Sequence, residues 1–279
     1  MKPIAIVTDS TSDIPAALAE QLQIQIIPCN VHFGQEVFRE RVDLTHAQFY
    51  EKLAAASELP KTSQPSAGAF LDLYKQLAPN HSAIVSIHIS AKLSGTLQSA
   101  TIAAKDITTL PIAIIDSGTA TMGLGWLAVI AARGAQARQS FDAIVASVES
   151  AKSRARVLAL LENLDNVVKG GRIGKGAAML GAVFNIKPII EVKDGEVHPS
   201  ERVRTWQKAK TRLSEMTKAF GPLAELAVLH ASNPAEALNL AAQLSEVFPR
   251  DRMVIGEVGA VLGTHAGRGA LGVMALVKD

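Results

Sequence analysis

The sequence predicts an α/β protein, and two observations support this fold class. In the first half of the chain, short apolar runs typical of buried strands alternate with longer stretches of helical periodicity. Strands and helices in this order form a mostly parallel sheet with helices on both faces. The chain has 279 residues, of which 48% are hydrophobic and 19% charged, so it can bury a large core. This length predicts roughly two domains.

We divide the chain near residue 150 and assign residues 1–150 to an N-terminal α/β domain. Its predicted strands are Pro3–Val7, Ile24–Pro28, Val31–Phe33, Ala83–Ile89 and Pro111–Ile115. One predicted helix begins at Pro15, and another begins at Ser66 and reaches Leu77. The other predicted helices of this domain span Thr45–Ala56, Thr96–Ile107, Thr121–Gln136 and Ser140–Lys152. Proline suits the first turn of a helix, and the hydroxyls of Ser66 and Ser140 suit the capping position.

Residues 151–279 form the predicted C-terminal α/β domain, whose sheet is mixed. Asp194-Gly195 favours a tight turn between the strands Asn185–Val192 and Glu196–Arg204 of a hairpin. After the hairpin, the predicted helices are Thr205–Phe220 and Pro234–Phe248. The predicted strands are Leu226–His230, Met253–Val258 and Leu271–Val277, and a glycine-rich loop at Gly263–Gly269 precedes the last of them. Ala177–Phe184 is a further helix candidate, apolar on nearly every face, which favours a core helix or a wall that faces lipid.

Composition excludes several classes of protein. The formal net charge of +2 gives no electrostatic case for a nucleic-acid-binding protein. The single cysteine, Cys29, excludes an intrachain disulfide and a thiolate metal cluster and fits a reducing cytoplasm. The longest uncharged stretch, Ser117–Ala132, falls short of the ~20 residues that a membrane-spanning helix needs. We therefore expect a cytoplasmic protein that is not inserted in a membrane, and the histidine spacing predicts no metal site.

The glycine-rich motifs do not predict a nucleotide cofactor. Gly267–Gly272 matches G-x-G-x-x-G, but it leads into a predicted strand, whereas the dinucleotide-binding fold needs a helix there. Gly170–Lys175 resembles a phosphate-binding P-loop only loosely, because the first glycine is misplaced and Gly176 stands where Ser or Thr is required. We expect no cofactor.

Four predicted loops are rich in glycine and hydroxyl side chains and contain no acid, which suits a small anion. They are Lys61–Ser66, Ser90–Thr96, Lys169–Lys175 and Gly263–Gly269. In the second segment, Ser94, Gly95 and Thr96 lie between a predicted buried strand and a helix. Free backbone N–H groups and the helix dipole attract an anion at such a position. The competing interpretation is that Ser94 only caps the helix.

The other candidate residues also have two interpretations. Thr62 and Ser63 are anion ligands or ordinary loop caps, and Arg172 is a ligand or a solvated surface charge. His265 is a structural histidine or an acid–base and hydrogen-bonding group, since its glycine-rich surroundings permit close approach of a ligand.

Six motifs occur in a fixed order along the chain. They are Val7–Asp13 (VTDSTSD), Thr62–Ser66 (TSQPS), Leu93–Ala100 (LSGTLQSA), Asp116-Ser117, Lys169–Ile173 (KGGRI) and Gly263–Gly267 (GTHAG). The ordered set resembles the DegV family, the bacterial fatty-acid-binding proteins also called FakB, from the N-terminus to the last strand. Two positions depart from the family pattern: Arg268 stands where proline is expected, and Gly174-Lys175 where serine is more usual.

The resemblance implies a two-domain DegV-like fold with a long-chain fatty acid at the interface between the domains. Thr62, Ser94 and the backbone at Gly95 would bind the carboxylate, with the remaining predicted site residues Ser63, Thr96, Arg172 and His265 nearby. The acyl chain would run into an apolar tunnel. The resemblance further implies a carrier and not an enzyme. A separate ATP-dependent fatty acid kinase phosphorylates the bound carboxylate, and the acyl phosphate enters phospholipid synthesis.

An enzyme is the alternative. Ser94 as nucleophile and His265 as base would make an esterase or acyltransferase, but such a triad also needs an orienting acid, and no motif supplies one. Around Ser94 the pattern G-x-S-x-G is absent, because Lys92 occupies the place of the first glycine. A Rossmann-like oxidoreductase is a second alternative and predicts nicotinamide binding.

Overall fold

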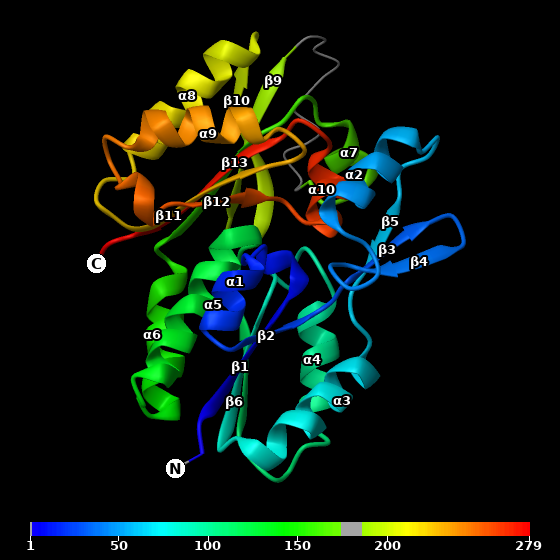
Figure 1. Ribbon diagram of the computed structural model, residues 1–279, viewed down its shortest axis with the longest axis vertical. Coiled ribbons are helices and arrows are strands. Elements are labelled where there is room, and N and C mark those ends of the chain that lie inside the picture. The colour runs from blue at the N-terminus through cyan, green and yellow to red at the C-terminus, as the bar shows by residue number, and fades with distance from the viewer. Residues whose placement is uncertain (1, 174–185) are drawn as a thin grey trace.

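The structure is a computed structural model that describes residues 2–173 and 186–279. Within these residues the strands form three sheets, and helices pack against them (Figure 1). The largest sheet is formed by the second half of the chain, and the other two are formed by the first half. The chain is thus a mixed α/β fold, as the sequence predicts.

The parallel sheet of the first half has the strand order β2-β1-β6-β7. These strands span Ile24–Ile27, Ile4–Asp9, Ala83–His88 and Ile112–Asp116. All three neighbouring pairs are parallel. Side chains alternate between the two faces, so Val7 packs in one core cluster with Phe70 and Tyr74, and Ile6 packs in another with Trp126.

Helices cover both faces of this sheet, as the alternating pattern predicts. On one face lie α3 (Ala67–Leu77) and α4 (Thr96–Ala104), and on the other α1 (Ala16–Gln21), α5 (Thr121–Gln136) and α6 (Phe141–Lys152) (Figure 1). The predicted caps are confirmed. The hydroxyl of Ser66 accepts the N–H of Ala69, and that of Ser140 accepts the N–H of Ala143. Short 3-10 helices cover Ser10–Ser12 and Ala78–Asn80.

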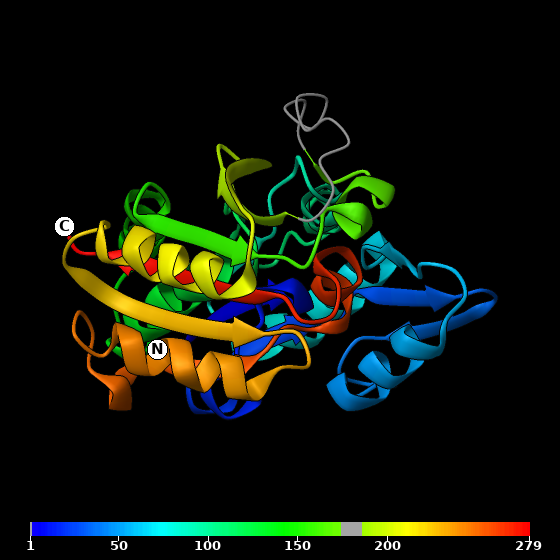
Figure 2. The same cartoon turned by 90° about the horizontal axis from the view of Figure 1, so that it is seen from above.

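A small antiparallel sheet with α2 (His46–Ala55) projects to one side of the molecule (Figures 1 and 2). Its strand order is β4-β3-β5, at Glu36–Arg39, Asn30–Phe33 and Lys61–Ser63. We did not predict β4. The prediction of a loop over Lys61–Ser66 is wrong for its first three residues, because their backbone pairs with Asn30–His32 of β3.

The mixed sheet of the second half has the strand order β10-β9-β8-β13-β11-β12. These strands span Glu196–Val203, Lys187–Lys193, Ala155–Leu160, Leu271–Val277, Leu223–His230 and Val254–Glu257. Only β11 and β12 pair in parallel. The hairpin of β9 and β10 is confirmed, and both turn residues, Asp194 and Gly195, have positive φ. The strand β8 was not predicted.

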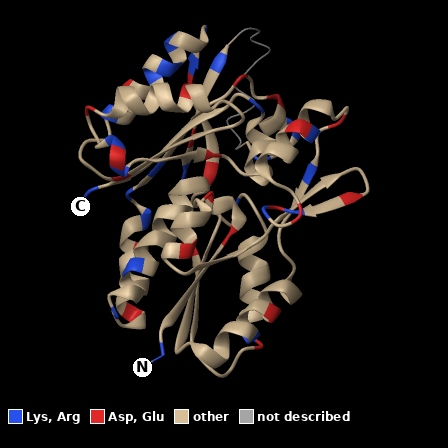
Figure 3. Cartoon of the chain, in the orientation of Figure 1, with Lys and Arg blue, Asp and Glu red and all other residues tan. Residues whose placement is uncertain are grey.

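Two long helices cover one face of the mixed sheet, namely α8 (Trp206–Lys218) and α9 (Pro234–Leu244). Figure 3 shows several basic residues along α8, with acidic and basic residues interspersed elsewhere. Two short helices, α7 (Asp165–Lys169) and α10 (Ala260–Ala266), lie near the small sheet, and a 3-10 helix covers Arg250–Arg252 (Figure 1). No helix in the described part of the chain is both long and apolar enough to cross a bilayer.

The segment predicted as a glycine-rich loop is in fact partly helical. Residues Ala260–Ala266 form α10, which ends at Gly267 with φ of 78°. The prediction of a loop at Gly263–Gly269 is therefore wrong for residues 263–266. Propensity disfavours a helix in so glycine-rich a stretch, and tertiary contacts at its start supply the missing stabilisation. The helix predicted at 177–184 lies outside the described residues.

The two halves contact each other through α5 and the mixed sheet. The indole N–H of Trp126 donates to the carbonyl of Met274 at 3.1 Å, and the hydroxyl of Ser90 donates to the carbonyl of Gly195 at 2.8 Å. The chain passes from α6 to β8 through Ser153 and Arg154. A division into two domains near residue 150 stays a prediction.

Candidate functional site

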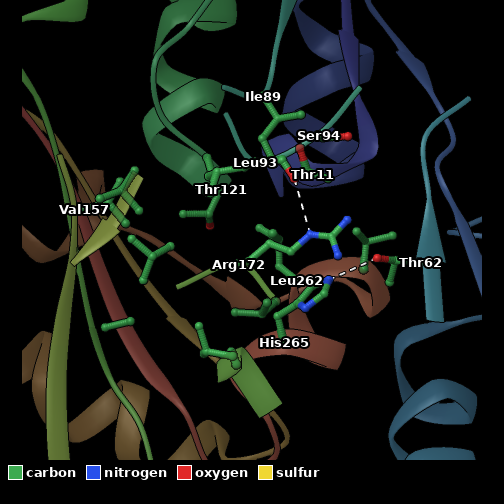
Figure 4. A pocket seen from close by; sticks show the side chains of 18 of the residues that line it. Thr11, Thr62, Ile89, Leu93, Ser94, Thr121, Val157, Arg172, Leu262 and His265 are labelled. Carbon is green, nitrogen blue, oxygen red and sulfur yellow. Dashed lines mark hydrogen bonds between the residues drawn. The ribbon is translucent and has the colours of Figure 1, made fainter. Parts of the chain in front are cut away.

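A cavity lies between the first half of the chain and the face of the mixed sheet that α8 and α9 leave uncovered. The cavity and the open solvent at its mouth together take up about 1060 Å³ of space that protein atoms do not fill. Figure 4 shows the side chains of 18 of the residues that line it. They come from segments throughout the chain, from Thr11 to Met274.

One wall of the cavity is apolar and is built by the mixed sheet. Because strand side chains alternate, Leu158 and Leu160 of β8 pack against α8 and α9, whereas Val157 and Ala159 face the cavity. The neighbouring strands continue this wall with Ile190, Val192, Val197 and Met274. Such a wall suits the hydrocarbon part of a ligand.

The polar side of the cavity centres on Thr62 and His265. Thr62 lies on β5 and His265 on the last turn of α10, and Thr62 Oγ1 lies 3.0 Å from His265 Nε2 (Figure 4). In the same view Val157 of the apolar wall lies on the opposite side. The structure therefore brings together two residues that the sequence analysis selected independently.

The imidazole of His265 is neutral near pH 7. Burial and then the charge of Arg172 lower the pKa of His265 to about 4. Among the described residues Nδ1 has no hydrogen-bond partner, although it is buried. A Cβ on Gly170 would lie only 2.2 Å from this nitrogen, so glycine at position 170 makes room for the ring.

Ser94 reaches the cavity from the loop before α4. Its hydroxyl lies 2.9 Å from Thr96 Oγ1 and accepts the N–H of Thr96 at 3.3 Å. Gly95 is the N-cap residue of α4, and a Cβ there would lie 3.0 Å from the amide nitrogen of Gln64. Ser94 lines the cavity, whereas Gly95 and Thr96 do not belong to the described lining. The interpretation that Ser94 only caps the helix is therefore wrong, because Gly95 is the N-cap residue and Ser94, one position before it, faces the cavity.

Ser63 also lines the cavity, next to Thr62. Its hydroxyl lies 2.9 Å from His32 Nε2 and accepts from the side-chain amide of Asn30 at 3.4 Å. These partners hold the hydroxyl in place within the small sheet. Ser63 thus faces the cavity with its hydrogen bonds largely satisfied.

Arg172 is the only charged side chain among the described residues that line the cavity. Its guanidinium donates to the carbonyl of Gly170 at 2.6 Å and to that of Leu93 at 3.4 Å. It extends toward Thr62 and His265 in Figure 4. A single cation without a facing acid in this lining favours an anionic ligand.

The geometry does not assemble the alternative esterase site. In the structure His265 bonds to Thr62, and Ser94 bonds to Thr96. No described side chain orients His265 through Nδ1, as the acid of a triad does. A pKa of about 4 also makes His265 a weak base. In the described part of the chain, no three His, Cys, Asp or Glu side chains gather in a way that could hold a metal ion.

Several residues of the cavity wall were not predicted from the sequence. Thr11, Cys29, Gln64 and Thr121 all line it. Thr11 belongs to the VTDSTSD motif, and Gln64 to the TSQPS motif, so neighbouring motif residues could have pointed to them. Cys29 gave no signal beyond being the single cysteine, and burial raises the pKa of its thiol well above its usual value.

A buried polar network supports Thr11 from behind. Asp9 accepts hydrogen bonds from the backbone N–H of Thr11 and of Ile89, each at 3.1 Å, and from the hydroxyl of Thr11. Its second oxygen lies 3.0 Å from Nδ1 of His88, whose Nε2 lies 2.7 Å from the Ser86 hydroxyl. Asp9, Ser86 and His88 are fully buried and do not line the cavity, so this Ser-His-Asp series is structural.

Comparison with known proteins gives a consistent result over the whole chain. The family model described as the DegV family matches residues 3–278. Protein DegV of Bacillus subtilis is 35% identical over 274 residues, which cover 97% of this chain and 98% of that protein.

Solved structures agree in fold along their full length. The crystal structure of DegV from Bacillus subtilis, described as a fatty acid binding protein, matches with a TM-score of 0.91 and 34% identity and covers 100% of both chains. A DegV family protein from Thermus thermophilus, described by its fatty acid binding, matches with a TM-score of 0.91 and 29% identity. That match covers 99% of this chain and 100% of the other.

Proposed function

This chain belongs to the DegV family, and we propose that it binds a long-chain fatty acid and presents its carboxylate to a separate fatty acid kinase. The carboxylate binds at the polar side of the cavity, at Thr62 and Ser94, with Arg172 and His265 beside it. The acyl chain lies along the apolar wall of the mixed sheet. The protein acts as a carrier, and the phosphoryl transfer is catalysed by its partner.

The observation that carries the proposal is the division of one cavity into two chemically different sides. Val157, Ile190 and Met274 offer hydrocarbon, while Thr62 and Arg172 offer hydrogen-bond donors. Burial of a chain contributes about 0.8 kcal/mol per CH₂. A buried carboxylate is costly unless donors satisfy it, and hydroxyl and guanidinium groups do so. A fatty acid meets both requirements.

Relatives support the chemical class of the ligand. The Bacillus subtilis and Thermus thermophilus proteins are both described by fatty acid binding, and both match this chain over essentially its full length. Identities of 34% and 29% leave room for a different chain length or degree of unsaturation.

The kinase step fits the way in which the carboxylate would be held. Hydroxyl donors occupy some of the lone pairs of a carboxylate and leave others free. A free carboxylate oxygen can attack the γ-phosphorus of ATP bound to the partner. The new O–P bond makes an acyl phosphate, and the bond to the β-phosphate oxygen breaks to release ADP.

Extraction of the purified protein with organic solvent, followed by mass spectrometry, tests ligand binding. We expect about one fatty acid per chain, strongly reduced in the double variant Thr62→Val/Ser94→Ala. Ser147→Ala is the matched control, because this exposed hydroxyl bonds only to the backbone of α6, at Ala143. Absence of fatty acid from the wild type, together with no uptake when palmitate is supplied, would refute the proposal.

A trapping experiment tests presentation to a kinase. The protein loaded with labelled palmitate is incubated with ATP and an extract of its host cells, and hydroxylamine converts acyl phosphate to a hydroxamate. We expect hydroxamate that depends on ATP and on the loaded protein. The carrier role is wrong if the loaded protein yields no hydroxamate in an extract that forms hydroxamate from free palmitate. This result would leave the proposal of fatty acid binding intact.

A further inference from the structure

Two buried carboxylates of the first half bind the start of α10 in the second half. Asp13 Oδ1 accepts the N–H of Gly259 at 2.9 Å, and Glu40 Oε1 accepts the N–H of Val261 at 2.9 Å. Asp13 is 2% exposed and Glu40 is 1% exposed. Burial at this level is unusual for acids, and neither residue lines the cavity, so the proposed ligand site does not account for them.

The two carboxylates converge on one point. A Cβ added to Gly259 would lie 2.3 Å from Glu40 Oε1 and 3.0 Å from Asp13 Oδ1. The absence of a side chain at Gly259 therefore lets both acids reach the backbone of α10. Two ionised carboxylates this close repel each other, and one of them retains a proton more readily as a result.

The surrounding groups do not cancel this repulsion. Arg41 is a cation that lowers the pKa of both acids, but its Nη1 donates to the carbonyl of Ile14, at 2.6 Å. Asp9 adds a further negative charge beside Asp13, whose second oxygen accepts the hydroxyl of Thr121 at 2.7 Å. The charges of the pair also act on two other titratable groups, Cys29 and Tyr50, which burial keeps protonated. The carboxylate of Glu257 acts on Tyr50 as well.

The protonation equilibrium of the pair falls near neutral pH. Burial, followed by the charge of Asp13, raises the pKa of Glu40 to about 7. Burial raises the pKa of Asp13 to about 6, against the lowering effects of Arg41 and of its hydrogen bonds. The hydroxyl of Ser10, the N–H of Val261 and the charge of Arg41 lower the pKa of Glu40 less than burial and Asp13 raise it, and the buried Oε2 of Glu40 has no partner at ordinary hydrogen-bond geometry among the described residues.

The helix that these acids hold is the one that carries His265. It has only seven residues, so its first and last turns move together. Tyr50 also holds the start, through a hydrogen bond from its hydroxyl to the carbonyl of Val258 at 2.9 Å. Val261, Leu262 and His265 of α10 line the cavity. A shift at the start of α10 therefore moves the polar side of the cavity.

We propose that Asp13 and Glu40 are positioning residues that share one proton and, by holding the start of α10, set the position of His265 at the polar side of the cavity. Loss of the shared proton makes both acids negative, and their repulsion loosens the start of the helix. The part of this inference that concerns affinity rests on the proposed function. A fatty acid carboxylate near His265 adds a negative charge, favours retention of the proton, and so binds less tightly as pH rises.

A measurement without ligand tests the positioning role. Ring ¹H–¹⁵N NMR signals of His265, assigned with His265→Gln, are followed from pH 5.5 to 8.5. The ring itself stays neutral over this range, because its pKa is about 4. We expect the wild-type signals to shift most around pH 7, where Glu40 titrates, and we expect this part of the shift to be absent in Glu40→Gln, in which Asp13, with a pKa of about 6, still titrates. Glu40→Gln keeps an oxygen for the N–H of Val261. Asp13→Asn is the second variant, used if Glu40→Gln does not fold.

The affinity for palmitate tests the consequence. We compare the affinity of the wild type with that of Glu40→Gln at each pH, because the ionisation of palmitate itself affects both proteins equally and cancels in the ratio. We expect the ratio of wild-type to Glu40→Gln affinity to fall at least about threefold from pH 6 to pH 8.5. Glu20→Gln on α1, an exposed glutamate, should follow the wild type. If the His265 signals of wild type and Glu40→Gln behave alike, the inference is wrong. If the wild type binds no palmitate at any pH, the proposed function fails, and the NMR result alone decides the inference.

Discussion

The hydroxyl of Thr62 and Nε2 of His265 lie 3.0 Å apart, although 203 residues separate them in the sequence. One comes from an edge strand of the small sheet and the other from the last turn of a short helix. These two side chains form the polar side of a cavity whose opposite wall consists of apolar side chains. The predictions below follow from this pairing and from the groups that hold it.

Replacement of Thr62 by valine removes a hydroxyl with little change of volume. We expect the affinity for palmitate to fall about tenfold or more, since a hydrogen bond to a charged group contributes about 1.5–3 kcal/mol. Isothermal titration measures the change. Thr101→Val is the control, because its exposed hydroxyl bonds to the carbonyl of Leu97 within α4. An affinity of Thr62→Val equal to that of the wild type would place the carboxylate elsewhere.

A methyl group on Gly170 should displace the ring of His265. The added Cβ would lie 2.2 Å from Nδ1, well inside a normal contact. We expect Gly170→Ala to weaken palmitate binding while the protein still folds. Gly68→Ala on α3 is the matched control, because its nearest neighbour is 3.7 Å from the added Cβ and alanine favours a helix. Gly170→Ala with wild-type affinity would remove His265 from the account.

A large side chain on the apolar wall should shorten the space for the acyl chain. Ala159 faces the cavity from β8, so Ala159→Phe fills part of it. We expect the ratio of affinities for palmitate and decanoate to fall, because the longer chain loses more of its contacts. Competition of the two acids for one protein sample measures this ratio. An unchanged ratio would mean that the acyl chain does not lie along the mixed sheet.

The sequence predicted the elements whose stability is local and the residues that belong to dense motifs. Helix α5 and strand β13 match their predicted bounds, because an unbroken apolar pattern specifies each of them. The strands β4 and β5 were missed, since they are short, polar and partly exposed. Their pairing with β3 is a tertiary effect that periodicity does not reveal.

The candidate site was predicted in part, for a similar reason. Thr62, Ser63, Ser94, Arg172 and His265 were selected from the sequence and all line the cavity. The sequence could not show that α10 is a helix, because Gly263 and the flanking Gly259 and Gly267 disfavour one. The hydrogen bonds that hold its start are accepted by Asp13 and Glu40, at the far end of the chain. Nor could the sequence show that Val157 rather than Leu158 faces the cavity, since that depends on which face of β8 the long helices cover.

Stability should depend on pH through His265. In the unfolded chain a histidine binds a proton below about pH 6.5, whereas in the folded protein burial lowers the pKa of His265 to about 4. Between these values the unfolded state binds more protons, so the free energy of unfolding falls as pH falls. We expect His265→Gln to lose less unfolding free energy than the wild type between pH 6.5 and 4.5, by about 2 kcal/mol.

Urea denaturation at several pH values measures this difference. His46, whose pKa burial also lowers to about 4, contributes equally to both proteins and cancels in the comparison. Parallel pH profiles for the wild type and His265→Gln would show that His265 takes up a proton as readily in the folded protein as in the unfolded chain.

A crystal structure of the protein with palmitate would show where the carboxylate and the acyl chain bind. The account predicts one carboxylate oxygen within hydrogen-bond distance of Thr62 Oγ1 and the acyl chain in contact with Val157, Ile190 and Met274 of the cavity wall. An acyl chain that enters in the reverse direction, with its carboxylate beside Val157, would contradict the account. Palmitate bound outside this cavity would contradict it as well.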